Sequence, residues 1–94
     1  MNLPINILHQ IKDFAKECSL DKVVLFGSRA RGTNRERSDI DLAVSGGSVQ
    51  RFEELLEEKA ETLLSFDIIN LDEVVSSKLM HNIQREGTLL YAKV

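Results

Sequence analysis

The sequence has little of what several protein classes require. It contains one cysteine, Cys18, so an internal disulfide cannot form. No apolar run approaches the roughly 20 residues that a membrane-spanning helix needs. The first residues show no basic stretch followed by an apolar one, as a secretory signal would. These absences exclude disulfide-stabilised and membrane-spanning classes and favour a cytoplasmic location.

Aromatic side chains are also scarce, at 5% of the chain with no Trp. With hydrophobic residues at 43% and charged residues at 29%, the composition is that of an ordinary globular protein. The 94 residues predict a single domain, 1–94, with a small core of Leu, Ile and Val. The net charge of -3 disfavours a nucleic-acid partner, because such proteins usually carry a basic face.

Hydrophobic periodicity predicts alternating helices and strands. Helices are expected at 3–18, at 51–64 and from an Asp72 cap to about Glu86, with Leu63 and Leu64 on the apolar side of the second. Strands are expected at 23–26, 40–44, 66–71 and 89–91, with a polar loop at 27–38 that cannot belong to the core. The β-α-β order from 40 to 71 predicts parallel neighbours, whereas the first two strands can run antiparallel. The predicted fold class is α/β (α+β), a small mixed β-sheet with helices packed on it.

Two carboxylates stand at the second predicted strand. Because strand side chains alternate, Asp39 and Asp41 should project to one side and Ile40 and Leu42 to the core side. Adjacent like charges repel, and a proton or a cation relieves the repulsion. Mg²⁺ suits this arrangement, because it prefers oxygen ligands from one or two carboxylates together with substrate phosphates.

A third acid, Asp67, lies within the next apolar strand and needs a partner there. If the two strands are neighbours, Asp67 lies beside Asp39 and Asp41. Three such carboxylates can hold two metal ions and support an in-line displacement at phosphorus. The alternative is that Asp67 faces solvent and pairs with an arginine of the loop 27–38.

The loop after the first strand carries groups suited to phosphate. Gly27 permits close approach to the backbone, and a turn or helix start there presents N–H groups to an anion. The Ser28 hydroxyl can donate a further hydrogen bond, and Arg29 and Arg31 add cationic donors. The alternative for both arginines is a solvated charged surface.

Two common phosphate-binding fingerprints are absent. Gly27 and Gly32 have P-loop spacing, but Thr33 stands where that motif needs lysine. No G-x-G-x-x-G occurs, which excludes the dinucleotide-binding motif. Arg35 and Arg37 of the same loop receive no assigned role.

The combined pattern resembles a known family. Gly27-Ser28, ten residues and then Asp39-Ile40-Asp41 is similar to the G-S-x10-D-x-D signature of DNA polymerase β-like nucleotidyltransferases. The strings GSRARG and SDIDL resemble the minimal nucleotidyltransferases of bacteria and archaea, and the likeness extends over nearly the whole chain. The resemblance implies that Gly27 and Ser28 hold the triphosphate, that Asp39 and Asp41 bind Mg²⁺, and that Asp67 completes the metal site and helps deprotonate an acceptor.

The resemblance also implies a reaction and a partner. A nucleoside monophosphate, expected to be AMP from ATP or another NTP, would pass to a hydroxyl with release of pyrophosphate. Small members of this kind are commonly paired with a helical HEPN-domain toxin, act as its antitoxin, and in some cases adenylylate a toxin tyrosine. The chain has no room for a further substrate domain, so another protein or a second copy in a homo-oligomer would supply the acceptor. The alternative is a binding module that neutralises a toxin by occlusion.

Overall fold

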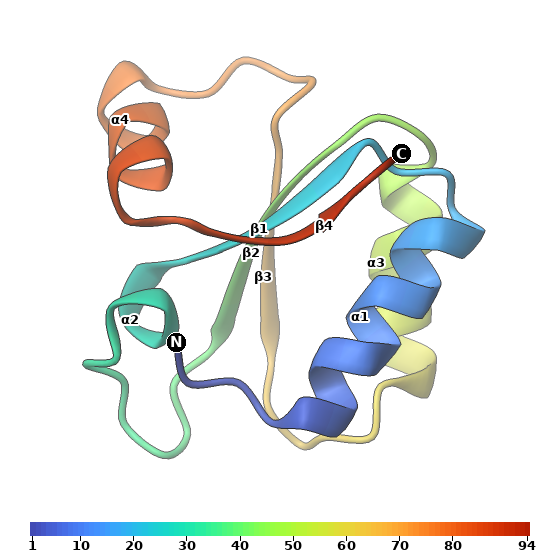
Figure 1. The fold of residues 1–94 in the computed structure, drawn as a ribbon, viewed down its shortest axis with the longest axis horizontal. Helices are drawn as coiled ribbons and strands as arrows, with labels where there is room; N and C mark the ends of the chain where they lie inside the picture. Colours follow the sequence, from blue (N-terminus) through green and yellow to red (C-terminus); the bar gives the residue numbers. More distant parts are fainter.

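The structure, a computed structural model, describes residues 1–94 and contains a mixed sheet flanked by helices (Figure 1). The helices are α1 (Ile5–Glu17), α2 (Gly27–Arg31), α3 (Val49–Lys59) and α4 (Ser77–Glu86), and the strands are β1 (Lys22–Phe26), β2 (Ile40–Ser45), β3 (Phe66–Asn70) and β4 (Thr88–Ala92). None of the helices has the length and apolarity needed to cross a membrane.

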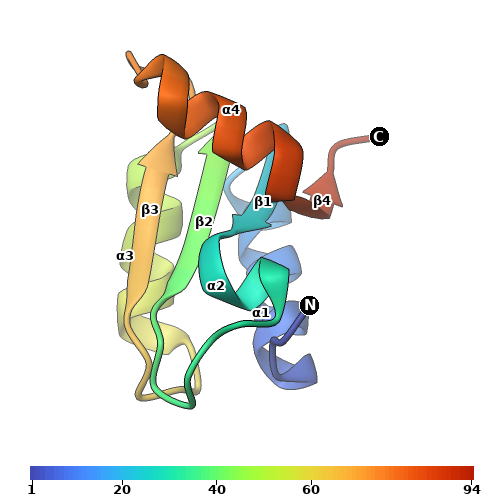
Figure 2. The same cartoon turned by 90° about the vertical axis from the view of Figure 1, so that its left-hand side faces the viewer.

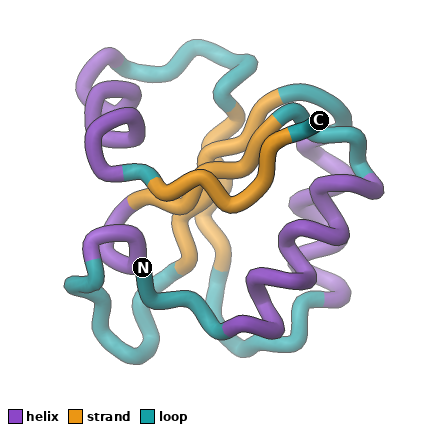
Figure 3. The backbone as a smooth tube through the Cα atoms, in the orientation of Figure 1, coloured by secondary structure: helices purple, strands orange, loops and turns teal.

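The sheet has the strand order β3-β2-β1-β4. Strand β1 runs antiparallel to both β2 and β4, whereas β2 and β3 are parallel and are joined through α3. Figure 3 shows the strands as a central layer with helices on both sides. Helices α1 and α3 cover one face, and α2 and α4 lie over the other (Figures 1 and 2). The predicted small mixed sheet with packed helices is confirmed.

The main core lies between the sheet and the α1–α3 layer. Strand alternation sends one set of β2 side chains into it, and these residues are fully buried: Ile40, Leu42 and Val44. Apolar positions at helical spacing on α1 and α3 meet them from the other side: Ile7, Ile11, Ala15, Phe52, Leu55 and Leu56. The opposite set of β2 side chains is therefore directed to the α2–α4 side.

Helix α3 ends five residues earlier than its apolar pattern predicts. A side chain of α1 is responsible: Gln10 donates to the carbonyl of Lys59 at 3.1 Å and accepts from the amide of Glu61 at 2.8 Å. These bonds take up backbone groups at the helix end, and the chain turns extended at Ala60. Leu63, predicted to join the apolar side of the helix, is instead fully exposed at 106%.

The start of α4 also differs from the prediction. Ser76 caps the helix by accepting from the Leu79 amide at 3.2 Å. Asp72 was the predicted cap, but its carboxylate accepts instead from the amide of Gly46 at 2.8 Å. Asp72 therefore joins the end of β2 to the segment after β3, and the last helix begins four residues later than the Asp72 cap would place it.

Two leucines near the end of α3 test this boundary. Leu56→Ala is expected to lower the free energy of unfolding by about 2–5 kcal/mol, because it empties a buried position. Leu63→Ala should change it by less than about 0.5 kcal/mol, because the side chain is exposed. Urea unfolding of the two variants measures both values. Equal losses would show that α3 continues to Leu64 as the sequence pattern suggests.

Candidate active site

The site is built around a close contact between the end of β1 and the start of β2. In the antiparallel register Phe26 lies opposite Asp41, and the next residue, Gly27, turns the chain into α2 with φ of +74°. A Cβ at Gly27 would collide with Oδ2 of Asp41 and lie 3.1 Å from its Cγ. Both the positive φ and the missing side chain are therefore required at this position.

The three predicted acids lie along adjacent strands. Asp41 is partly buried in β2 and stands opposite Asp67 in the parallel register of β2 and β3. Asp39, just before β2, and Asp67 are both exposed. Since Ile40 and Leu42 enter the core, alternation directs Asp39 and Asp41 to the α2–α4 side. The structure thus places Asp67 on the strand beside the other two acids.

The negative charges of the other two acids act on the pKa of Asp41. Burial raises the pKa of the Asp41 carboxyl, and the nearby negative charges of Asp67 and Asp39 raise it further. Arg31 and Arg29 act in the opposite direction and do not cancel the effect. The ionised form of Asp41 is therefore disfavoured unless positive charge is added beside it.

The donor set fits a divalent cation only in part. No group of three or more His, Cys, Asp or Glu side chains is arranged to hold a metal ion. Mg²⁺, however, is usually held by one or two carboxylates, and substrate phosphates and water supply its other ligands. The oxygen donors of Asp39 and Asp41, with their excess negative charge, meet that requirement.

Arg29 has a place that the sequence did not indicate. The side chain is buried, and its guanidinium donates to the carbonyls of Ser38 at 3.0 Å, Glu36 at 3.1 Å and Asn2 at 3.2 Å. It therefore fastens the loop before Asp39 to the N-terminal segment. The polar loop is expected to lie outside the core; Arg29 is not part of the hydrophobic core, but its side chain is buried beneath the loop.

Arg31 forms an ion pair with Glu86 at the end of α4. Its Nη1 donates to Oε2 of Glu86 at 2.8 Å, and Arg85 donates to the second oxygen at 3.0 Å. The hydrogen bond from Arg31 is the main reason that the pKa of Glu86 is lowered. The bridge joins α2 to the end of α4, 55 positions apart. Sequence reasoning missed Glu86, because no local pattern links it to the loop.

The two arginines differ because residues two apart on a helix face different directions. All three guanidinium nitrogens of Arg29 donate to backbone carbonyls, whereas Arg31 has one nitrogen committed to a carboxylate and remains exposed. Arg31 is therefore the better placed of the two to meet a phosphate.

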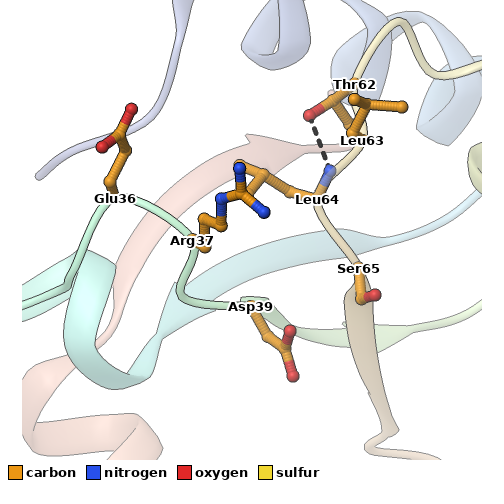
Figure 4. A pocket seen from close by; sticks show the side chains of 7 residues that line it. All are labelled: Glu36, Arg37, Asp39, Thr62, Leu63, Leu64 and Ser65. Atoms are coloured by element: carbon orange, nitrogen blue, oxygen red, sulfur yellow. Dashed lines mark hydrogen bonds between the residues drawn. The ribbon is translucent and has the colours of Figure 1, made fainter.

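A cavity of about 530 Å³ opens beside Asp39, between the loop before β2 and the loop before β3. Its lining residues are Glu36, Arg37, Asp39, Thr62, Leu63, Leu64 and Ser65 (Figure 4). Arg37 and Leu64 point toward each other across it. Within the loop before β3, the Thr62 hydroxyl accepts from the Leu64 amide at 3.1 Å. The Ile40 amide donates to the Ser65 carbonyl at 2.9 Å, and this bond holds the two loops side by side.

Comparison with known proteins finds a family and several solved structures that are similar to this chain. A sequence model of the family described as polymerase beta, nucleotidyltransferase, matches residues 9–94. A crystal structure of a toxin-antitoxin with AMP-PNP is similar, with a TM-score of 0.73, 22% identity and coverage of 92% of this chain and 73% of that chain. A crystal structure of a mutant of the MntA-HpeT toxin-antitoxin is also similar, with a TM-score of 0.72, 24% identity and coverage of 92% of this chain and 73% of that chain. A protein from Shewanella oneidensis has a TM-score of 0.65 and 20% identity, with coverage of 93% of this chain and 71% of that chain. No curated protein matches the chain.

Two glycines with the same backbone strain test the contact with Asp41. Gly32→Ala should cost about 1–2 kcal/mol, because its φ is +79° and nothing lies near the new methyl group. Gly27→Ala should cost distinctly more, because the Asp41 carboxylate must also move. The comparison is made by urea unfolding. Equal costs for the two variants would contradict the packing of Gly27 against Asp41.

The raised pKa of Asp41 makes stability depend on pH in a defined direction. Because the folded state binds this proton more tightly than the unfolded state, stability falls as pH rises from the ordinary value of 3.8 through the raised pKa. Asp41→Asn has no carboxyl to titrate at this position. Its free energy of unfolding relative to that of the parent protein should therefore rise across that pH range and then stay constant. Urea unfolding between about pH 3 and pH 7 tests the trend. Asp13→Asn, on the exposed side of α1, serves as the control. If the free energy of unfolding of Asp41→Asn relative to the parent protein fell with rising pH, the cause assigned to the raised pKa of Asp41 would be contradicted.

Proposed function

The chain belongs to the polymerase β family of nucleotidyltransferases, and from this premise we propose that it transfers AMP from ATP to a hydroxyl of a partner protein with the help of Mg²⁺. The observation that carries the proposal is the juxtaposition of Asp41 with the Gly27 turn on one side and Asp67 on the other. This arrangement brings a turn suited to phosphate next to crowded carboxylates, which supports the proposal.

The phosphate end of the site is the start of α2. The N–H groups of a first helical turn have no intrahelical acceptor, so they can donate to phosphate oxygens. Gly27 leaves the backbone open, and the Ser28 hydroxyl adds a donor. Arg31, held by Glu86, supplies a positive charge at the end of the same short helix. These groups would bind the triphosphate and retain the departing pyrophosphate.

The acids would act on the reacting atoms. Asp39 and Asp41 would hold the metal, with Asp67 beside them and phosphate oxygens as further ligands. When bound, Mg²⁺ would offset negative charge on the phosphates and on the leaving group. The acceptor oxygen forms a bond to the α-phosphorus, and the bond from that phosphorus to the bridging oxygen of pyrophosphate breaks. The acceptor proton passes to Asp67, which acts as general base.

The solved structures support the choice of nucleotide and partner. Those that resemble this chain include toxin-antitoxin assemblies, and one of them contains AMP-PNP. The motif resemblance to minimal nucleotidyltransferases points to a helical HEPN-domain toxin as the partner. We therefore place the acceptor hydroxyl on such a toxin and assign this chain the role of antitoxin.

One observation favours a second function, neutralisation by occlusion without catalysis. The acids do not form a group of three arranged for a metal ion. A chain that had kept the fold and lost the reaction would still present its surfaces to a toxin. The two functions differ in whether the carboxylates are needed.

Label transfer separates the two functions. With Mg²⁺, α-labelled ATP and a helical HEPN-domain protein as the acceptor, the parent chain should label that protein. Label in the γ-position should not transfer, because pyrophosphate leaves. The Asp39→Asn, Asp41→Asn double variant should lose at least about a hundredfold in rate, because it removes the groups proposed to hold the metal. The Asp13→Asn control should transfer normally.

The same variants decide the biological role in cells. If the double variant folds but no longer neutralises the toxin, the enzymatic function is supported. Full neutralisation by the double variant, or label transfer at the parent rate, would overturn it in favour of occlusion or of a different set of catalytic groups.

A further inference from the structure

The order of the strands places the parts of the site on a line. The Gly27 turn follows β1, the acids Asp39 and Asp41 belong to β2, and Asp67 belongs to β3. The loop 62–65 leads into β3 and lines the cavity beside Asp39. The loop 62–65 of this cavity therefore lies on the β3 side of Asp39 and Asp41, and the turn suited to phosphate lies on the β1 side.

The chemistry requires such a division. In an in-line displacement at phosphorus the entering and leaving oxygens stand on opposite sides of the phosphorus atom. If pyrophosphate leaves over Gly27 and Ser28, the acceptor must approach from the β3 flank. The cavity of about 530 Å³ opens on that flank and shares Asp39 with the acid cluster.

Resting on the proposed function, we propose that the cavity between loops 36–39 and 62–65 receives the polypeptide segment that carries the acceptor hydroxyl. The cavity is bounded by backbone on both sides, and the bond between the Ile40 amide and the Ser65 carbonyl keeps its two loops together. It is a formed site beside the reacting groups, on the side from which the acceptor must come.

The lining indicates a polypeptide and disfavours a nucleic acid. It carries two acids, Glu36 and Asp39, against one cation, Arg37, together with the leucines 63 and 64 and the hydroxyls of Thr62 and Ser65. A groove for RNA or DNA would need an excess of positive charge and aromatic surfaces for the bases. Mixed polar and aliphatic side chains suit a peptide segment instead.

Leu63 marks the rim of the cavity. It is exposed at 106%, beyond the end of α3, and contributes nothing to the core. A large apolar side chain in this position gains burial only when another chain covers it. Val74, exposed at 102% in the segment between β3 and α4, provides a matched exposed residue that is absent from the cavity lining.

Amide chemical shifts of the ¹⁵N-labelled chain test the proposal in two stages. First, Mg²⁺ with a non-cleavable ATP analogue is added, and the amides of Gly27, Ser28 and Asp41 are expected to shift. Second, blocked pentapeptides Ala-Ala-X-Ala-Ala, with X as Tyr, Ser or Thr, are titrated into that complex. At least one of these peptides should shift Arg37 and the amides of 62–65. Leu63→Glu should weaken its binding at least about tenfold, whereas Val74→Glu should leave it unchanged.

Each result is decisive. A missing response in the first stage overturns the proposed function and the acceptor site with it. A normal first stage followed by no peptide response at 62–65, by a response confined to residues 68–79, or by equal binding to the two variants overturns the acceptor site alone. Shifts of the cavity by an RNA trinucleotide but by no peptide would replace the polypeptide acceptor with a nucleic acid. Since both variants alter exposed residues, unchanged shifts elsewhere verify the fold.

Discussion

The packing of the Asp41 carboxylate against the bare backbone of Gly27 is the constraint on which the rest of the site depends. It brings the end of β1 so close to β2 that only glycine fits, and it starts α2 at that point. Burial raises the pKa of the Asp41 carboxyl, and the neighbouring charges of Asp67 and Asp39 raise it further. The fold therefore holds negative charge where an added cation or a proton would stabilise it.

Two arginines maintain this geometry from different positions. Arg29 is an internal clamp on the loop before Asp39, and Arg31 is tied to Glu86 at the end of α4. The loop from 27 to 39 has little regular structure beyond α2, so these bonds give it a defined shape. They also make α4 part of the site, although it contributes no acid to the proposed metal ligands.

Much of the fold could be predicted because its patterns are local. The alternation of Ile40, Asp41 and Leu42 indicated both a strand and the face on which the acids lie. The errors have tertiary causes. Gln10 of α1 ends α3 early, and the bond from Gly46 occupies Asp72.

The site shows the same division between local and distant information. The spacing from Gly27 to Asp41 and the acid in the following strand could both be predicted from the sequence. The burial of Arg29 and the bridge to Glu86 could not, since each depends on chain segments far away.

Calorimetric titration with a non-cleavable ATP analogue tests the central claim most directly, because it needs no partner protein. If the acids and the Gly27 turn form one nucleotide site, binding should require Mg²⁺. It should also be lost when Asp39 and Asp41 are both replaced by asparagine. Binding of equal strength without Mg²⁺, or to the double variant, would contradict the account.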